Sequence, residues 1–386
     1  MKKAKWLYIE DAVFQVNKRD KRTCGDFYLC QRTYEHTIFI LCDGIGSGIK
    51  ANLAATMCAN RLLFLLDAGV SLFRTCEMVL SMMHKAHTEE DIPYAAFSIA
   101  WILNNGQYTI ISYESPVPLL VNGNSAEPVL QRSFILAREL VGESTGVLRD
   151  GETLVLMSDG ITQAGLGRIP GLGWGTEGVN SFFNYNLYRD QPLVSIARAA
   201  IDKAGELSGG YHPDDTSIAI LSCRQANVLN IMTGPAAHKR DDQIFVADFM
   251  NSSGYKAVCG STTADVVARV LKLPVEATEI SEFFSQPPLY KIKGIDLVTE
   301  GAVTLNQVFN ILDEDPEEFD SNSCVSDLAR MMLDADIIKF FIGEARNPSH
   351  AGISFKQMGV LPRHTIINLL IQKLTEKGKI ILQYHK

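Results

Sequence analysis

The sequence predicts an α+β fold with antiparallel sheets in its first part and an α/β domain with a mostly parallel sheet in its second. Two observations lead to this fold class. The first part contains strand pairs joined by tight turns, with a few helices between them, whereas short apolar strands alternate with helices after about residue 226. We therefore place a domain boundary near residue 225 and expect domains at 1–225 and 226–386.

In the first domain, alternating apolar residues predict strands, and apolar residues three and four positions apart predict helices. Strands are expected within 5–16 and 26–43, followed by helices at 49–67 and 71–88. Further strands are expected at 95–105, 107–115, 118–123, 150–160 and 214–224, with helices near 176–188 and 192–207. Asn-Asn-Gly and Asn-Gly turns join the middle strands, and such turns favour antiparallel hairpins.

In the second domain, four short apolar strands each end at or near a glycine. They are expected at 228–234, 255–260, 295–301 and 337–343, separated by helices near 239–251, 262–272, 302–313 and 364–377. The loops after these strands are rich in small and hydroxylated residues, and in a parallel sheet they would share one edge, where ligands bind. This domain is therefore expected to sense a small ligand, with a dimerisation or substrate-docking module as the alternative.

Composition excludes some function classes. The 386 residues are 46% hydrophobic and 21% charged, with a net charge of −8, which argues against a nucleic-acid-binding protein. The basic start of the chain is interrupted by acids, unlike a signal peptide. The most apolar window, residues 61–73, contains Arg61 and Asp67 and is too short to span a bilayer. We expect a cytoplasmic protein with no nucleic-acid or membrane partner.

The eight cysteines are scattered and form no CxxC pair, which argues against a zinc site or a disulfide framework. Most are expected to be small buried side chains. Cys24 and Cys42 lie close in sequence to acidic residues, so a redox-sensitive thiol is a minor alternative there.

The stretch TIFILCDGIGSGIKANLAATMC, residues 37–58, joins an apolar strand to a helix through a glycine-rich turn. A nucleotide-binding loop would require GxxxxGK followed by Ser or Thr, or GxGxxG. Here Gly48 is followed by Ile-Lys-Ala, and Gly44, Gly46 and Gly48 lie at alternate positions, so both patterns fail. The alternative is that the strand end carries a metal-binding carboxylate.

Two further acidic elements favour the carboxylate interpretation. Asp159–Gly160 follows a second apolar strand, and Asp214 precedes a third. We expect Asp43, Asp159 and Asp214 to meet at one sheet edge, where a cation would neutralise their mutual repulsion. All-oxygen ligation favours Mg²⁺ or Mn²⁺, and glycine after aspartate would let a carbonyl or water approach the ion.

The sequence resembles the PPM-type (type 2C) serine/threonine phosphatases, and in particular the bacterial branch typified by stage II sporulation protein E. The motifs GDFYL, CDGIGSGIKA, SYESPVPLLV, DGETLVLMSDGIT and DDTSIAIL occur in the order and approximate spacing of that family. The resemblance covers about residues 5–223 and does not extend to the second domain. It implies a layered fold in which helices flank an antiparallel β-sandwich.

The resemblance also implies roles for individual residues. Asp43 would bridge two Mn²⁺ or Mg²⁺ ions, and the carbonyl of Gly44 would bind one of them. Asp159 and Asp214 would be the remaining metal carboxylates. Asp26 would lie near the metal-bound waters or bind a third ion. These four carboxylates are therefore the predicted catalytic residues.

The sequence departs from the family pattern at two points. Ile45 occupies the position of a histidine that is proposed as general acid in eukaryotic members, and the phosphate-gripping basic residue is not clearly placed. Asp215 is expected to support its turn, and His212 either assists protonation or makes a backbone hydrogen bond. Three basic residues before Asp26 are candidates for the phosphate grip: Arg19, Lys21 and Arg22.

The implied activity is hydrolysis of phosphoserine or phosphothreonine on a partner protein by a metal-activated water, opposed by a serine kinase and regulated by the second domain. The alternative is a catalytically idle signalling scaffold, or a ligand-sensing protein, that retains the fold. Because helix 49–67 begins at the metal-binding turn, a partner that moved it would alter metal occupancy. The sequence does not determine the oligomeric state.

Overall fold

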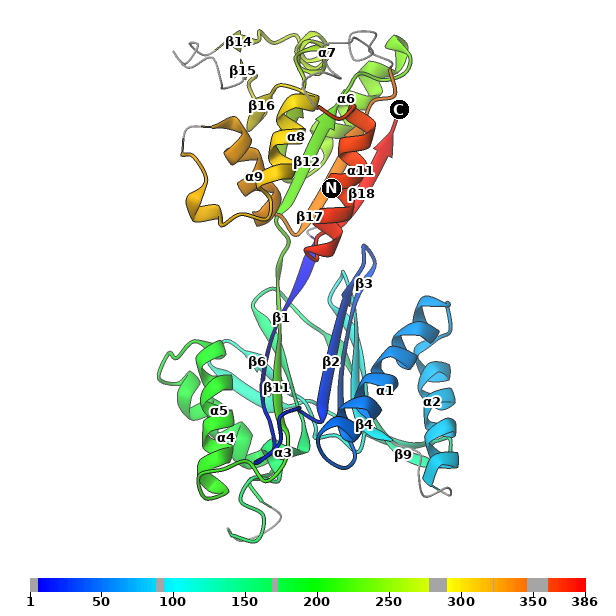
Figure 1. Cartoon of the computed structure of the whole chain (residues 1–386), viewed down its shortest axis with the longest axis vertical. Coiled ribbons are helices and arrows are strands. Elements are labelled where there is room, and N and C mark those ends of the chain that lie inside the picture. Colours follow the sequence, from blue (N-terminus) through cyan, green and yellow to red (C-terminus); the bar gives the residue numbers. More distant parts are fainter. Residues whose placement is uncertain (1–5, 88–93, 169–172, 278–289, 322, 346–359) are drawn as a thin grey trace. The chain divides into compact units, whose positions relative to one another are not determined.

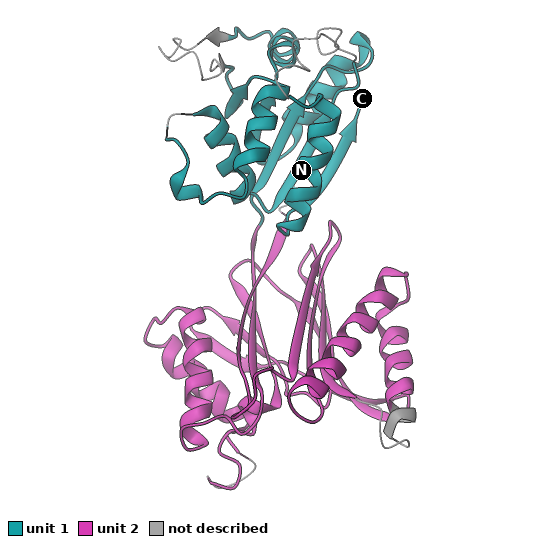
Figure 2. Cartoon of the chain, in the orientation of Figure 1, with its two compact units in different colours: residues 1–5, 226–386 teal, residues 6–225 magenta. Residues whose placement is uncertain are grey.

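The computed structural model describes residues 6–386 apart from 88–93, 169–172, 278–289, 322 and 346–359. The chain divides into two compact units, of which one comprises residues 6–225 and the other includes residues 226–386 (Figure 2). Each unit has its own sheets and its own hydrophobic core.

The first unit contains two antiparallel sheets. Sheet A has the strand order β1-β11-β10-β6-β7, with bounds Leu7–Val16, Thr216–Gln225, Glu152–Met157, Leu119–Asn122 and Ser125–Pro128. Sheet B has the order β2-β3-β4-β5-β9-β8, with bounds Asp26–Arg32, His36–Gly44, Ala95–Leu103, Gln107–Tyr113, Glu139–Val147 and Arg132–Leu136. The helices are α1 Ile49–Asp67, α2 Leu72–His87, α3 Asp159–Thr162, α4 Gly175–Leu187 and α5 Leu193–Leu207.

Strand alternation explains why these sheets stack into layers. In β3, Ile38 and Ile40 pack into the core beneath α1 and α2, whereas Phe39 and Leu41 pack against sheet A. In β11, Ile218 and Ile220 face α4 and α5, and the residues between them face sheet B. The unit is therefore a four-layered α/β/β/α sandwich, with α1 and α2 on one flank and α4 and α5 on the other (Figure 1). The layered α+β fold expected from the sequence is confirmed.

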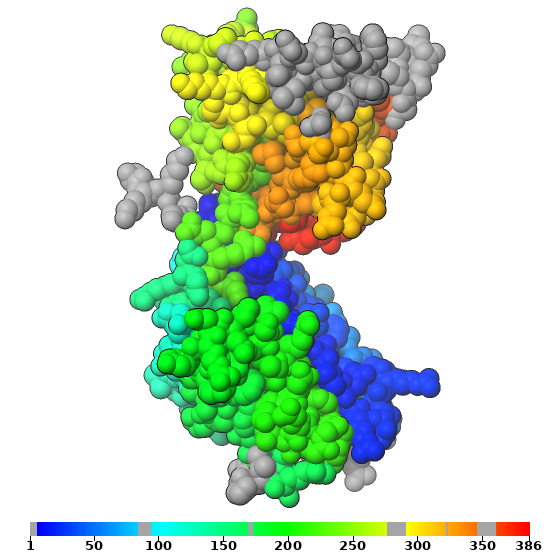
Figure 3. Space-filling model, turned by 90° about the vertical axis from the view of Figure 1, so that its left-hand side faces the viewer, coloured from blue at the N-terminus to red at the C-terminus, as the bar shows by residue number. Residues whose placement is uncertain are grey.

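Helices α4 and α5 form a large continuous part of the surface of this unit, drawn in green in Figure 3. Their buried faces carry Val179, Phe183, Ile196 and Ala200, at helical spacing. These side chains cover the outer face of sheet A. They belong to the same core cluster as Ile161 of the short helix α3.

Helix α1 has one buried face and one exposed apolar face. Ala55, Leu62 and Leu66 are buried against sheet B, whereas Leu53 and Met57 are more than half exposed. Among the described residues, it is the helix whose length and mean hydropathy of 1.2 are compatible with a membrane span, and 44% of that window is buried. One such helix is weak evidence for membrane insertion.

The sequence reasoning missed the β8–β9 hairpin. Its two-residue turn is formed by Ala137 and Arg138, both with positive φ (52° and 72°), instead of the asparagine and glycine that usually mark this turn. Strand β7 and helix α3 were also missed, since each has only four residues. The other expected elements of this unit are confirmed to within a few residues.

The second unit is built on sheet C, with the order β14-β15-β16-β13-β12-β17-β18. Strands β16, β13, β12, β17 and β18 are parallel, and the short β14 and β15 pair antiparallel at one edge. The strands are β12 Val228–Thr233, β13 Tyr255–Cys259, β14 Glu276–Ala277, β15 Tyr290–Lys291, β16 Leu297–Thr299, β17 Ile337–Ile342 and β18 Ile380–His385. The mostly parallel sheet expected from the sequence is confirmed.

Helices cover both faces of sheet C. They are α6 Asp242–Asn251, α7 Ser261–Leu271, α8 Ala302–Ile311, α9 Cys324–Asp334 and α11 Arg363–Glu376, with short 3₁₀ turns at Lys239–Asp241 and Pro316–Glu318. Helices α6 and α7 pack on one face, and α8, α9 and α11 pack on the other. The sequence reasoning missed α9, β18 and the two-residue strands β14 and β15.

The two faces of α1 give a stability prediction. We expect Leu62→Ala, which removes a fully buried side chain, to destabilise the first unit by about 2–5 kcal/mol. Met57→Ala on the same helix is the control and should cost less than about 0.5 kcal/mol, because Met57 is exposed. Urea unfolding followed by tryptophan fluorescence measures both, since all three tryptophans (Trp6, Trp101 and Trp174) lie within residues 6–225. Equal losses would contradict the assigned packing.

Candidate functional site

The antiparallel register of β2 and β3 places two acidic residues directly opposite each other. Asp26 opens β2 and pairs with Asp43 near the end of β3. Asp26 is 2% exposed, and Asp43 is half-buried. Like charges directly opposite on neighbouring strands destabilise a sheet, so this pair needs a reason beyond folding.

Two further acids approach this pair from the other sheet. Asp159 begins α3 directly after β10, and Asp214 lies just before β11. Burial is the largest cause that raises the pKa of Asp43, and the negative charges of Asp159 and Asp214 raise it further. The expectation that Asp43, Asp159 and Asp214 meet at one sheet edge was wrong. Asp43 lies in β3 of sheet B, whereas Asp159 and Asp214 flank the ends of β10 and β11 of sheet A, so the acids converge between the two layers of the sandwich.

Two glycines allow the segments that carry the acids to approach closely. A Cβ on Gly44 would lie 1.8 Å from the carbonyl oxygen of Ala51 in α1, and a Cβ on Gly160 would lie 2.1 Å from that of Asp215. The glycine after each aspartate is therefore required for packing of the chain itself. This reason is additional to the access for a metal ligand that the sequence suggested.

Hydroxyl groups from sheet A hold the most deeply buried acid. The Ser217 hydroxyl donates to Asp26 Oδ2 at 2.5 Å, and the Ser217 backbone N–H donates to Ser158 Oγ at 2.9 Å. These two serines link β11 and the end of β10 to the start of β2. They were not identified from the sequence, because a serine in a strand carries no pattern that distinguishes it.

Two carboxylate oxygens of the cluster lack hydrogen-bond donors. Asp26 Oδ1 and Asp159 Oδ1 are buried without a partner among the described residues, whereas Asp159 Oδ2 accepts from Gln163 Nε2 at 2.7 Å. A buried oxygen without a donor costs free energy, which a cation would recover.

The electrostatic cost of the cluster is visible in its pKa values. Burial, followed by the neighbouring Asp26 and Asp159, raises the pKa of Asp43 from 3.8 to about 10. Burial also raises the pKa of Asp26, to about 6, although hydrogen bonds from Ser217 and Ser158 oppose the shift. The pKa of Asp159 is raised by the same cause. Ionising these carboxyl groups together therefore costs free energy in the folded protein.

The residues present fit a divalent metal ion in chemistry but are not already arranged around one. Four carboxylates and two donor-free oxygens match the hard oxygen ligands that Mg²⁺ and Mn²⁺ prefer. No group of three or more His, Cys, Asp and Glu side chains within the described residues has the close mutual distances of a formed metal site. The assignment of Asp26, Asp43, Gly44, Asp159 and Asp214 as metal ligands therefore stays a prediction.

Comparison with known families gives this geometry a context. Residues 33–224 match the family model of the stage II sporulation protein E (SpoIIE) domain. These residues belong to the SpoIIE family. The family resemblance drawn from the sequence motifs is confirmed, and the SpoIIE domain lies within the first unit. No curated protein matches the chain significantly.

Solved structures of low sequence identity also resemble the chain. The PP2C phosphatase domain with a regulatory fragment of SpoIIE from Bacillus subtilis is 15% identical, with a TM-score of 0.48, over 57% of this chain and 65% of that one. The RsbU and RsbW domains of Rv1364c from Mycobacterium tuberculosis are 16% identical, with a TM-score of 0.48, over 64% and 70%. RsbX in complex with magnesium is 18% identical, with a TM-score of 0.40, over 56% and 100%.

A lysine that the sequence reasoning overlooked contacts the cluster of the SpoIIE domain. Lys18 Nζ lies 3.2 Å from Asp214 Oδ1, and the Lys18 backbone N–H donates to Asp215 Oδ1 at 2.8 Å. Asp215 thus supports its turn, as expected. Arg19, one of the proposed phosphate-gripping residues, instead lies over the ring of Tyr211 at 5.0 Å. Lys18 belongs to the same basic run, but only the tertiary structure distinguishes it from its neighbours.

The remaining candidates of the SpoIIE domain have structural contacts. His212 Nδ1 lies 3.2 Å from Thr216 Oγ1, its backbone oxygen accepts from Arg19 N–H, and burial lowers its pKa. Ile45 is 45% exposed and offers no proton donor. Burial raises the pKa of the Cys24 thiol to about 12, which argues against a reactive thiolate.

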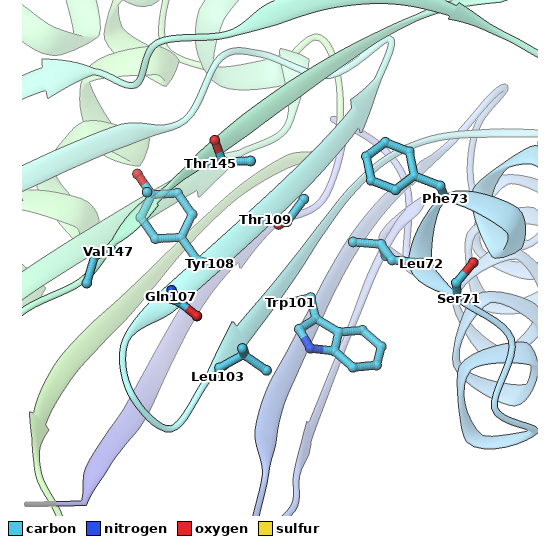
Figure 4. Close-up of a pocket in the computed structure, with 11 residues that line it drawn as sticks. Ser71, Leu72, Phe73, Trp101, Leu103, Gln107, Tyr108, Thr109, Thr145 and Val147 are labelled. Carbon is cyan, nitrogen blue, oxygen red and sulfur yellow. The ribbon is translucent and has the colours of Figure 1, made fainter. Parts of the chain in front are cut away.

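A cavity of about 670 Å³ in the SpoIIE domain lies apart from the acidic cluster. Leu72 and Phe73 at the start of α2 line one side, and Trp101, Thr109 and Thr145 from the sheet line the other (Figure 4). The lining contains no carboxylate, histidine or cysteine side chain, so this cavity offers none of the usual ligands of a metal ion.

Removing one acid tests the cost of assembling the cluster. We expect Asp43→Asn to raise stability in metal-free buffer by roughly 1–3 kcal/mol, because an amide relieves the buried repulsion. The stabilisation of the native chain by Mn²⁺ should disappear in the same variant. Asp214→Asn is the control and should bring a smaller gain, since Asp214 is 47% exposed and its charge is paired with Lys18. A lower melting temperature for Asp43→Asn without metal would contradict this.

The effect of Asp43 should depend on pH with a defined sign. Its folded-state pKa of about 10 lies above its ordinary value of 3.8, so the unfolded chain releases this proton first. The destabilisation is therefore absent below pH 3.8, grows as pH rises and levels off above about pH 10. The melting temperature of Asp43→Asn should exceed that of the native chain by more at about pH 8 than at about pH 5. Calorimetry in EDTA measures the difference, and a constant gap would refute the raised pKa.

Proposed function

We propose that residues 6–225 form a metal-dependent phosphatase that hydrolyses phosphoserine or phosphothreonine on a partner protein. The observation that carries this proposal is the convergence of four acids from both sheets into one cluster, Asp26, Asp43, Asp159 and Asp214. Burial raises the pKa of the first three. Membership of residues 33–224 in the SpoIIE family supports the same assignment.

The four carboxylates would hold two Mn²⁺ or Mg²⁺ ions, or a third at Asp26, and the Gly44 carbonyl would add a ligand. Bound ions would supply a water of lowered pKa as the nucleophile. Asp26 would be held in place by Ser217, and Asp159 by Gln163, so that their donor-free oxygens are oriented toward the cluster.

Lys18 is the cation of this chain that we assign to the substrate phosphate. Its ammonium group already contacts Asp214 and could pair with a phosphate oxygen beside the acids. With Ile45 in place of a histidine and His212 bonded within its own turn, no imidazole among the described residues is placed as the general acid. The leaving alkoxide would then take its proton from solvent at the site.

The same proposal includes a phosphorylated partner protein as substrate and a serine kinase that opposes the phosphatase. It also includes regulation of the phosphatase by residues 226–386. Their support is the family membership and the presence of a separate α/β unit in the chain. A cytoplasmic location stays a prediction from the sequence.

A competing function is a catalytically idle signalling fold. It is favoured by one observation, the lack of a formed metal geometry among the acids of the described residues. The two functions differ in whether adding metal produces turnover.

Hydrolysis of p-nitrophenyl phosphate with and without Mn²⁺ decides between them. The native chain should show metal-dependent turnover, and Asp43→Ala should reduce it roughly 100-fold or more, because a bridging ligand is lost. Asp202→Ala is the matched control: it removes an exposed aspartate from α5 and should leave the rate unchanged. A phosphoserine peptide should follow the same pattern. Absence of turnover in the native chain with Mn²⁺ and Mg²⁺ would favour the idle fold.

A further inference from the structure

The order of the parallel strands in the second unit predicts a ligand-binding crevice at one edge. Taken in chain order, β12, β13 and β16 extend from the centre of sheet C in one direction, and β17 and β18 extend in the other. The order therefore reverses between β12 and β17. In open α/β sheets the carboxyl ends of the strands at such a reversal leave a crevice in which ligands bind.

The loops at this edge are bonded to one another into a continuous backbone surface. Gly343 N–H donates to Thr233 O at 2.9 Å, and Gly234 N–H donates to the Thr263 hydroxyl at 2.8 Å. A Cβ on Gly301 would lie 3.4 Å from Gly260 Cα, so the loops after β13 and β16 also run side by side. A glycine follows each of these strands, which leaves the backbone open to close approach.

Three helices begin at this edge without a side-chain cap. The N-caps of α7, α8 and α11 are Gly260, Gly301 and Pro362, none of which makes a side-chain cap, and no acidic residue lies in any of the three first turns. By contrast, Ser323 caps α9, and Asp327 lies in its first turn. The three uncapped helix starts therefore add positive potential at the same edge.

An arginine without a described carboxylate partner lies in the crevice. Arg363 Nη2 donates to the carbonyl oxygens of Gly343 at 2.7 Å and Ala345 at 3.1 Å, and Nη1 occupies the space that a Cβ on Gly234 would need. Its Nε is buried without an acceptor among the described residues. Burial lowers the pKa of Arg363, so the charged form is under-solvated and an anion would stabilise it.

Two buried hydroxyl groups near the crevice also lack partners. Thr233 ends β12 and Thr304 lies in the first turn of α8; both are 0% exposed, and neither Oγ1 has a hydrogen-bond partner among the described residues. Paired hydrogen bonds between Asn306 and Leu361 fix the start of α11 against α8, which brings Arg363 to the same place. Unsatisfied donors of this kind are costly unless a ligand accepts from them.

We propose that this crevice, formed by Gly234, Thr233, Gly301 and Arg363, binds the phosphate group of a small phosphorylated metabolite. A phosphate presents three terminal oxygens and up to two charges, enough to accept from a guanidinium, a hydroxyl and helix N–H groups together. A carboxylate presents only two oxygens. The site does not depend on phosphatase activity, because every group in it belongs to residues 226–386.

A second cavity in this unit has the opposite character. It has a volume of about 450 Å³ and lies at the amino ends of β12 and β13, where Asp296 and Asp334 contribute to its lining. Two carboxylates and no basic side chain make that cavity unfavourable for an anion. At the carboxyl edge, the acids Asp242 and Glu344 are paired with Arg269 and His385, respectively.

Isothermal calorimetry on the full chain tests the proposal, with inorganic phosphate, ribose 5-phosphate and adenosine monophosphate as probes. EDTA and the Asp43→Asn background keep phosphate from binding with metal at the acidic cluster. We expect at least one probe to bind with a dissociation constant below about 1 mM. Arg363→Gln should weaken binding at least tenfold, and Lys272→Gln, which removes an exposed charge at the far end of α7, should not.

Two further variants keep the test decisive if Arg363→Gln is unstable. Arg363→Lys retains the positive charge but lacks the planar guanidinium that can donate two parallel hydrogen bonds. It should weaken binding less than Arg363→Gln. Thr233→Val removes one unsatisfied hydroxyl, so it should keep the fold and weaken binding about threefold or more. The proposal is overturned if no probe binds the native chain at about 10 mM, or if Arg363→Lys and Thr233→Val both bind with native affinity. Loss of phosphatase turnover would leave these results unchanged.

Discussion

Repulsion among buried carboxylates is the constraint on which the first unit depends. Asp26 and Asp43 face each other across a strand pair, and Asp159 and Asp214 approach from the opposite sheet. Such an arrangement opposes folding, so the rest of the sandwich must supply the free energy that holds it. The interlayer core, which includes Phe39, Leu41, Leu156 and Leu221, does so by burying apolar surface from both sheets. A cluster that costs stability and is nevertheless retained is characteristic of functional sites.

The same packing connects the cluster to the helices around it. Gly44 follows Asp43 and lies against the backbone of Ala51 in α1, and Gly160 follows Asp159 and lies against Asp215. Asp43 and Asp159 are therefore each held by the glycine that follows, whose backbone contact leaves no room for a Cβ atom. Displacement of α1 would be transmitted directly to Asp43, which gives a physical basis for the regulatory role expected of that helix.

The candidate sites of the two units carry charges of opposite sign. The first concentrates four acids, of which Asp214 is paired with Lys18, and the negative charge of the others suits cations. The second places three uncapped helix starts and Arg363 at the carboxyl edge of a parallel sheet, and this arrangement suits an anion. Both sites lie where strands end, because backbone groups and side chains become available to a ligand there without disrupting a sheet.

The sequence by itself predicted most of the strands and helices, a division near residue 225 and four candidate acids, because alternation, helical spacing and Asp–Gly turns are local patterns. It did not determine the β8–β9 hairpin, whose turn residues Ala137 and Arg138 carry no turn signature. Only the tertiary structure decided that the acids converge between two sheets, that Lys18 is the basic residue beside Asp214, and that Arg363 reaches Gly234. These relationships join residues far apart in the chain. They depend on strand pairing and layer packing, which local residue patterns do not specify.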